Sequence, residues 1–139
     1  KKISEKVNIL LVENNNCSDL VLFEWRDLYT QLKQIIIGDN CCSRVRSFEL
    51  RYLPLLEVVI IGENSFTESP NGAGDEGKTF SITNCSSLTT ITIGCFSFSD
   101  FREFILGDVD RLQYLTIGNR RKKSCNFYHA SFVLRSIYA

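Results

Sequence analysis

The segment with the strongest chemical signature is rich in glycine and carries a lysine near its end. Residues 72–79 read GAGDEGKT and match G-x-x-x-x-G-K-[ST], the pattern of phosphate-binding loops. Such a loop needs a strand directly before it and a helix from its end, so that backbone N–H groups, the lysine and a hydroxyl on Mg²⁺ converge on phosphates. Here the preceding apolar run, Val58 to Ile61, ends ten residues upstream, and Thr79-Phe-Ser-Ile-Thr predicts a strand. We therefore expect an exposed loop, and a nucleotide-binding enzyme that uses the 72–79 loop is only the third alternative.

Histidine and cysteine, which commonly catalyse reactions or bind metals, match no catalytic or metal-binding motif in this sequence. His129 is the single histidine and belongs to no motif with a mechanism, so we expect a structural role for it. The cysteines lack the C-x-x-C spacing of zinc sites. They are Cys17, Cys41, Cys42, Cys85, Cys95 and Cys125. The sequence therefore predicts no catalytic residue, no metal and no cofactor, which means a protein that is not an enzyme.

The charge balance bears on the class of partner. The chain has 139 residues with 16 basic and 16 acidic side chains, for a formal net charge of zero. Nucleic acids and anionic membranes are bound through an excess of Lys and Arg, so this balance argues against both. We interpret the one basic run, Arg120 to Lys123, as a solvated loop from a small insertion. No apolar stretch approaches the ~18 residues of a membrane span, so we expect no membrane insertion and a protein partner or self-association.

One motif recurs along the chain and dictates the fold. Each copy places a leucine before two alternating aliphatic residues, and most copies continue through a glycine to an Asn and a Cys or Phe. The copies begin near residues 7, 32, 56, 88 and 112, so their spacing is 25, 24, 32 and 24 residues. The long interval contains an insertion that we place within residues 68–78. We therefore expect residues 1–139 to form a single solenoid.

These copies carry a family resemblance. The segments at 32–42 and 56–66 resemble the consensus L-x-x-[IVL]-x-[IVL]-x-x-N-x-[CF] of leucine-rich repeats, and the other three resemble it degenerately. The resemblance extends over nearly all of residues 7–137. It implies coils whose consensus strands form a parallel sheet on a concave face. It also implies that Asn15, Asn40 and Asn64 form a ladder of hydrogen bonds to the backbone of neighbouring coils, which Phe96 and Arg120 interrupt.

Alternation within each unit predicts two short strands per coil. Ile35 and Ile37 alternate with outward residues in the first half of a unit, as expected of a strand. The second half, such as SFELR at 47–51, alternates as well. The predicted fold class is therefore mainly β, a leucine-rich-repeat-like solenoid of about five coils with a parallel concave sheet, short convex strands and little helix. Neither end looks capped, so we expect the natural chain to continue or its ends to meet another subunit.

The outward positions of the concave strands form the candidate binding surface, because none of them is charged. The first three coils contribute an apolar stripe, and exposed stripes of this kind mark interaction surfaces. The candidate residues are Ile9, Leu11, Gln34, Ile36, Val58, Ile60, Thr90, Thr92, Tyr114 and Thr116. The leading function is a non-catalytic repeat scaffold for protein–protein interaction through the concave or lateral surface. The alternative is a structural subunit of a self-assembling polymer, for which an extracellular location is one option.

The cysteines and two sequons bear on the compartment. Cys17 and Cys42 occupy the same repeat slot in adjacent coils, so we expect their α-carbons within roughly 7 Å and a disulfide where the compartment is oxidising. Cys41 should point the other way. Asn16 and Asn84 begin N-x-S sequons, which are acceptors of N-glycosylation. Cysteines and sequons together permit an extracellular location without establishing one.

Overall fold

The computed structural model describes residues 3–69 and 77–136, and this part of the chain consists of strands and turns without a helix. All ten strands are four or five residues long. Their bounds are β1 (Ile9–Val12), β2 (Leu22–Trp25), β3 (Gln34–Ile37), β4 (Ser47–Arg51), β5 (Val58–Ile61), β6 (Thr79–Thr83), β7 (Thr90–Ile93), β8 (Glu103–Gly107), β9 (Tyr114–Ile117) and β10 (Ser131–Arg135). Since no helix is described, none is present there that could cross a membrane.

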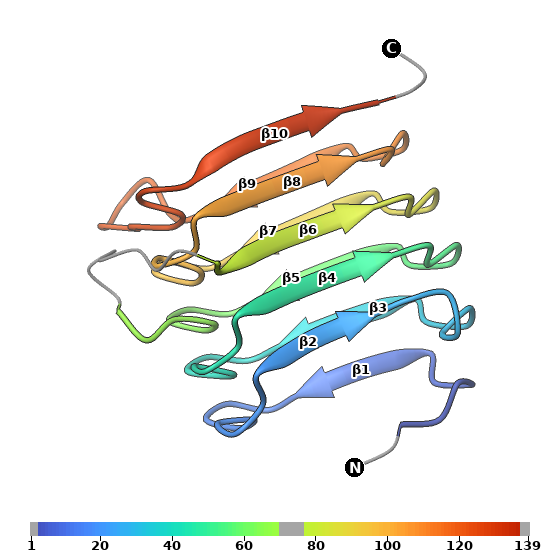
Figure 1. The fold of residues 1–139 in the computed structure, drawn as a ribbon, viewed down its shortest axis with the longest axis horizontal. Coiled ribbons are helices and arrows are strands. Elements are labelled where there is room, and N and C mark those ends of the chain that lie inside the picture. Colours follow the sequence, from blue (N-terminus) through green and yellow to red (C-terminus); the bar gives the residue numbers. More distant parts are fainter. Residues whose placement is uncertain (1–2, 70–76, 137–139) are drawn as a thin grey trace.

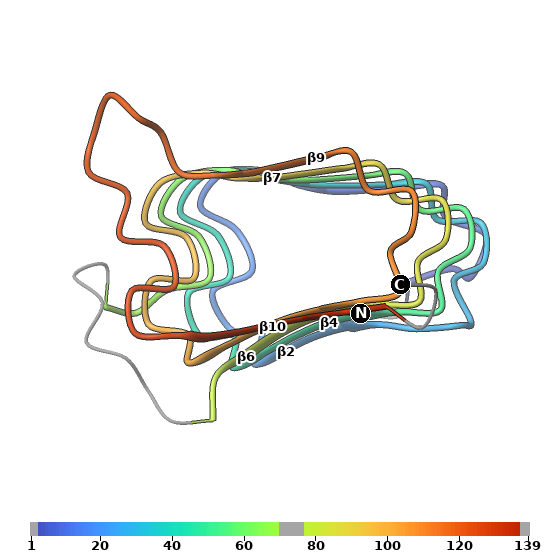
Figure 2. The same cartoon turned by 90° about the horizontal axis from the view of Figure 1, so that it is seen from above.

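The strands form a stack of coils with two parallel sheets. The odd-numbered strands make one sheet in the order β1-β3-β5-β7-β9, here called sheet A, and the even-numbered strands make sheet B. Successive coils lie one above the other along the stack (Figure 1). The two sheets run along opposite sides of each coil and are joined by corners at both ends (Figure 2). The predicted fold class, a β-solenoid of about five coils with two short strands each, is confirmed.

Strand register follows the spacing of the motif. In sheet A, Ile9 pairs with Gln34, Gln34 with Val58, Val58 with Thr90 and Thr90 with Tyr114, which are offsets of 25, 24, 32 and 24 residues. The long offset arises between β5 and β6, where the insertion was predicted. In sheet B the last offset, from Glu103 to Ser131, is 28 residues. The extra residues belong to the loop after β9 that contains the basic run, which projects beyond the other corners (Figure 2).

Two columns of phenylalanine rings fill the interior. The first column lies on sheet B, and its neighbouring rings stack at centroid distances of 4.6 to 5.0 Å. Its members are Phe23, Phe48, Phe80, Phe104 and Phe132. Phe66, Phe98 and Phe127 stack in a second column at 4.7 and 5.3 Å and meet the first column edge-on. Offset stacks and edge-to-face contacts are the favourable aromatic geometries, so the two columns join successive coils.

The corners after β3, β5 and β7 require glycine because neighbouring coils approach closely there. A Cβ on Gly94 would lie 2.5 Å from the carbonyl oxygen of Gly62, and one on Gly38 would lie 2.3 Å from Asn14 Oδ1. No larger residue fits either position without displacing the adjacent coil. The recurrent glycine is therefore a requirement of stacking, as its position in the motif indicated.

The predicted asparagine ladder has the right positions but a different bonding pattern. Asn15, Asn40 and Asn64 all adopt left-handed backbone conformations, with φ between 56° and 64°. Their hydrogen bonds to neighbouring coils come from the main chain, and in the described residues the side-chain contact is Asn64 Nδ2 donating to Asn40 Oδ1 over 2.8 Å. Asparagine suits these slots because it tolerates the left-handed region better than most residues. The expectation that these side chains cap the backbone is therefore wrong.

The side chains one position before two of these asparagines do bind the backbone of the neighbouring coil. Asn14 and Asp39 each accept a hydrogen bond, at 2.7 and 2.8 Å, from a main-chain N–H of the next coil. Deeper in the corner, Ser65 and Ser97 each accept an N–H from the preceding coil and donate to the carbonyl of a glycine there. Sequence analysis missed this buried serine ladder, because serine at a corner also fits an exposed turn.

Four of the cysteines are buried and two are half-buried. The buried ones are Cys41, Cys42, Cys85 and Cys95, while Cys17 and Cys125 are partly exposed. The Cys41 thiol donates to the carbonyl oxygen of Glu13 over 3.0 Å. Burial raises the pKa of Cys85 to about 11. The buried cysteines therefore behave as small apolar side chains.

Cys17 and Cys42 occupy adjacent coils, as predicted, and are both free thiols in the structure. The Cys42 N–H donates to Asn16 O over 3.1 Å, and burial together with the neighbouring Cys17 thiol raises the pKa of Cys42. We expect a mild thiol oxidant to join these two residues by a disulfide, because Cys17 is only half-buried and solvent reaches it. The bridge should raise the free energy of unfolding by about 3 kcal/mol. Peptide mapping without reductant would identify the pair, and Cys17→Ser is the control; a bridge that joins other cysteines would contradict the expectation.

Candidate interaction surface

The outward face of sheet A brings all ten candidate residues onto one surface. Strand register sorts them into two rows that run along the stack. One row contains Ile9, Gln34, Val58, Thr90 and Tyr114, and the other contains Leu11, Ile36, Ile60, Thr92 and Thr116. Because side chains alternate across a strand, the residues between these positions point into the core.

The apolar part of this face is continuous over three strands. Leu11, Ile36 and Ile60 are direct neighbours in one row, while Ile9 and Val58 lie in the other. Ile9, Leu11 and Ile60 are 52%, 60% and 39% exposed, which is high for large aliphatic side chains. The stripe thus presents apolar surface to solvent on β1, β3 and β5, while threonines continue both rows on β7.

Sheet B provides the contrast. Its outward positions include Glu24, Glu49 and Arg51, and Arg26 follows directly after β2. The guanidinium of Arg26 lies 2.6 Å from the Glu49 carboxylate. Charged, ion-paired side chains are ordinary for a sheet face in water. The uncharged face of sheet A is therefore a property of that sheet and not of the whole solenoid.

The lysine of the phosphate-loop match is not exposed. Lys78 is 1% exposed, and its Nζ lies 2.8 Å from Asp100 Oδ2 and 2.9 Å from Glu68 Oε1. Burial lowers the pKa of Lys78, but the hydrogen bonds and charges of Asp100 and Glu68 outweigh this effect and raise it. The expected exposed loop is thus wrong for Lys78, because carboxylates from the two flanking turns enclose its ammonium group.

The strand–loop–helix context of a phosphate loop is also missing among the described residues. Thr79, which would hold Mg²⁺ in such a loop, begins β6 and pairs with Ser47 in the sheet. Residues 72–76 of the match lie outside the described residues. The described part of the motif therefore serves the solenoid, with Lys78 in an ion pair and Thr79 in a strand.

The remaining predicted sites lie on the surface and do not converge. His129 is exposed and contacts the ring of Tyr128 edge-on. Asn16 is exposed and Asn84 is half-buried in a left-handed turn. No group of three or more His, Cys, Asp or Glu side chains that could hold a metal occurs within residues 3–69 and 77–136.

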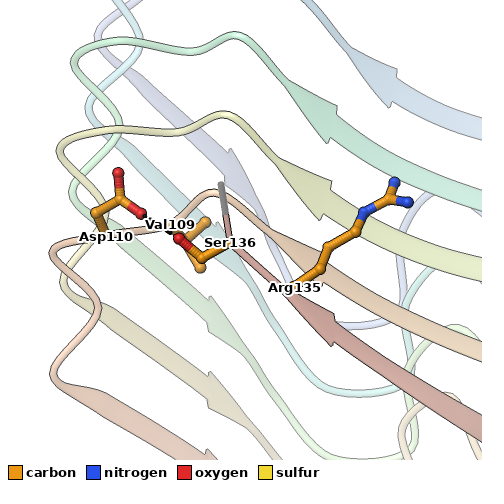
Figure 3. Close-up of a pocket in the computed structure, with 4 residues that line it drawn as sticks. All are labelled: Val109, Asp110, Arg135 and Ser136. Atoms are coloured by element: carbon orange, nitrogen blue, oxygen red, sulfur yellow. Dashed lines mark hydrogen bonds between the residues drawn. The ribbon is translucent and has the colours of Figure 1, made fainter. Parts of the chain in front are cut away.

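The described surface has open depressions. One of about 580 Å³ lies beside the end of β10 (Figure 3). Ser136 Oγ donates to Asp110 Oδ1 there over 3.2 Å, while Arg135 extends away from that pair (Figure 3). These residues form no enclosed cavity with convergent polar groups, which is what a small-molecule site requires.

Comparisons with known proteins give no match: no family model, no curated protein and no solved structure is significantly similar to this chain. The evidence for a function therefore comes from the surface of the solenoid itself.

Proposed function

We propose that this chain is a divergent leucine-rich-repeat protein whose solenoid is a non-catalytic scaffold for protein–protein interaction. The partner binds the outward face of sheet A, centred on Leu11, Ile36 and Ile60. The single observation that carries this proposal is the absence of charge from all ten outward positions of that face.

Physical reasoning supports a protein as the partner. Large exposed aliphatic side chains gain free energy when another apolar surface removes them from water, by about 25 cal/mol per Å². The threonines and Gln34 around the stripe can exchange hydrogen bonds with a partner at the rim, as in other interfaces. An extended strand scaffold also holds these side chains in place before binding, which reduces the entropic cost of association.

A matched pair of substitutions tests the proposal. Ile36 and Ile105 are both half-buried, outward-facing isoleucines in central strands, the first in sheet A and the second in sheet B. Ile36→Lys is expected to weaken partner binding at least about tenfold, because it places a charge in the middle of the apolar stripe. Ile105→Lys should leave binding unchanged.

The measurement begins with affinity capture from the natural source by the immobilised wild-type chain. Quantitative mass spectrometry then compares the captured proteins with those held by the two variants, and the selected protein is titrated directly by calorimetry. Circular dichroism confirms that both variants are folded. A partner that binds Ile36→Lys as tightly as wild type, or that is lost only with Ile105→Lys, would refute the proposed face.

A further inference from the structure

The loop that follows β9 lies beside the outward face of sheet A. It comprises residues 118–124 and rises above the plane of sheet A on the outward side, beyond the corners of the other coils (Figure 2). An open depression of about 690 Å³ is lined by residues of both the sheet and the loop. They include Thr116, an outward residue of the candidate face, together with Gly118, Arg120 and Arg121. The loop therefore forms a wall at one end of the candidate interaction surface.

Hydrogen bonds within this loop fix its shape. The main-chain N–H of Arg121 donates to Asn119 Oδ1 over 2.8 Å, and that of Asn119 donates to Ser124 Oγ over 2.9 Å. Gly118 has a φ of 76°, and a Cβ on it would lie 2.5 Å from Ser124 Oγ, so only glycine fits the base of the loop. A loop that is ordered before binding reduces the entropic cost of association.

The loop carries more positive charge than its surroundings neutralise. Lys122 forms an ion pair with Glu63 of the third coil. Arg120, Arg121 and Lys123 are exposed, and none of them forms an ion pair with another described residue. Three uncompensated positive charges therefore lie next to a sheet face that has no charged residue of its own.

The other charged residues at the edges of sheet A offer no competing site. Lys33 and Glu57 directly precede β3 and β5, and their opposite signs leave that edge without net charge. At the edge with the loop, Asp39 already accepts the main-chain N–H of Glu63 over 2.8 Å. Glu13 is exposed but lies four strand spacings from β9, which at ~4.8 Å each is about 19 Å, or about two Debye lengths in physiological salt. The loop is therefore the dominant charge that a partner meets beside β9.

We propose that the partner of sheet A carries acidic side chains, which bind Arg120 and Arg121 while its apolar side chains cover Leu11, Ile36 and Ile60. This inference rests on the proposed function and adds the chemistry of the partner and its direction along the stack. Opposite charge beside an apolar contact fixes the register of two proteins and speeds their encounter. Arginine suits this role because its planar guanidinium binds a carboxylate through two parallel hydrogen bonds.

The apolar stripe favours a polypeptide over a nucleic acid as the occupant. A nucleic acid gains its affinity from many phosphate contacts along a basic surface, and the positive charge here is confined to one loop. A protein segment with an apolar stretch followed by Asp or Glu residues fits both the stripe and the loop.

Selection of displayed peptides tests this chemistry without knowledge of the natural partner. Random peptides of about 14 residues can span the five strands, since about 19 Å takes about six residues in an extended chain or about 13 in a helix. Peptides that bind Ile36→Asn, which removes the apolar centre without adding charge, are discarded first. The peptides that the wild-type chain then retains are expected to contain more Asp and Glu, and less Lys and Arg, than the unselected library.

A charge reversal on the loop tests the contact directly. Arg120→Glu/Arg121→Glu is expected to weaken binding of a selected acidic peptide at least about tenfold, measured by calorimetry in about 0.05 M salt. Arg44→Glu/Arg111→Glu makes the same change in net charge at exposed arginines outside the loop, and should alter affinity less than about twofold. Replacing the acidic residues of the peptide by Gln and Asn should also weaken binding, and should add little when combined with the loop variant. If circular dichroism shows that the loop variant is unfolded, Arg120→Gln/Arg121→Gln replaces it.

The outcomes separate this inference from the proposed function. Retained peptides without acidic residues, or acidic peptides that bind Arg120→Glu/Arg121→Glu as tightly as wild type, would overturn the inference and leave the proposed face intact. If no peptide depends on Ile36, the proposed face itself is refuted and the inference with it. A short single-stranded RNA that displaces the peptide and binds Ile36→Asn as tightly as wild type would assign the loop to nucleic acid, which also overturns the inference.

Discussion

Lys78→Met is expected to reduce the free energy of unfolding by about 3–5 kcal/mol, the usual cost of removing one partner from a buried ion pair. Asp100 is 2% exposed and would lose the ammonium group 2.8 Å from its Oδ2. Among the described residues its other oxygen, Oδ1, has no hydrogen-bond partner, so the carboxylate would stay buried with little compensation. Denaturation in guanidinium chloride, followed by circular dichroism, measures the change.

Two controls make this result specific. Lys78→Met/Asp100→Leu removes both buried charges, and should recover most of the lost stability, because the remaining carboxylate, Glu68, is about half exposed and is solvated. Lys122→Met breaks the exposed ion pair with Glu63 and should leave stability unchanged, since solvent screens that pair. A double variant as unstable as Lys78→Met would show that the lysine stabilises the corner by packing and not by its charge.

The pH dependence follows from the same pair. The pKa of Lys78 is raised in the folded protein, so the native state holds this proton more tightly than the unfolded chain does. The contribution of the pair is therefore fully present below the ordinary lysine pKa of about 10.4 and declines as pH rises through the higher folded value. The stability difference between wild type and Lys78→Met should accordingly be constant near neutral pH and shrink above about pH 10.5.

Phe98→Ala should be equally damaging and should act through packing. The Phe98 ring is fully buried and contacts five other phenylalanine rings at centroid distances of 4.7 to 5.3 Å. Loss of a buried phenylalanine ring costs about 3–5 kcal/mol, from lost burial and the cavity left behind. Because these contacts join both columns, we also expect a broader unfolding transition as neighbouring coils uncouple.

The backbone makes alanine the informative replacement at this position. Phe98 has a φ of 56°, and alanine in the left-handed region bears a similar backbone cost, so the difference reports the ring. Tyr128→Ala, at an aromatic residue that is 62% exposed, should change stability by no more than about 0.5 kcal/mol and serves as the control. Thermal and guanidinium unfolding would measure both variants, and a small effect of Phe98→Ala would mean that the columns contribute little.

Much of this fold can be predicted from the sequence because the repeat determines the strands, their register and the inward positions together. Ile35, Val59 and Ile91 recur at the same slot, and alternation of side chains then determines which neighbours face outward. Spacing between copies determines the register, so the candidate face on sheet A follows from residue types alone. The recurrent glycines at 38, 62 and 94 can also be predicted from the motif, since only glycine permits the close approach of neighbouring coils there.

Contacts between coils that are made by residues outside the repeat motif are visible only in the tertiary structure. Lys78 meets Asp100 from the next coil, and no local pattern announces a pair of residues so far apart in the chain. The motif instead suggested a phosphate loop, because a sequence pattern records spacing but not what encloses a side chain. Ser65 and Ser97 are buried and bind backbone groups in a corner, yet serine is common in solvated turns as well.

The inward positions of the first and fifth coils show the same division. The sequence by itself determined which positions face inward, because the alternation of side chains is a property of residue order. Only the tertiary structure decided that Phe132 and Leu134, at core positions of the repeat, are exposed while Phe23 is buried. The physical reason is that a repeat position specifies the direction of a side chain, whereas burial depends on what covers it, and in the first coil Ile3, Trp25 and Tyr29 pack against the core.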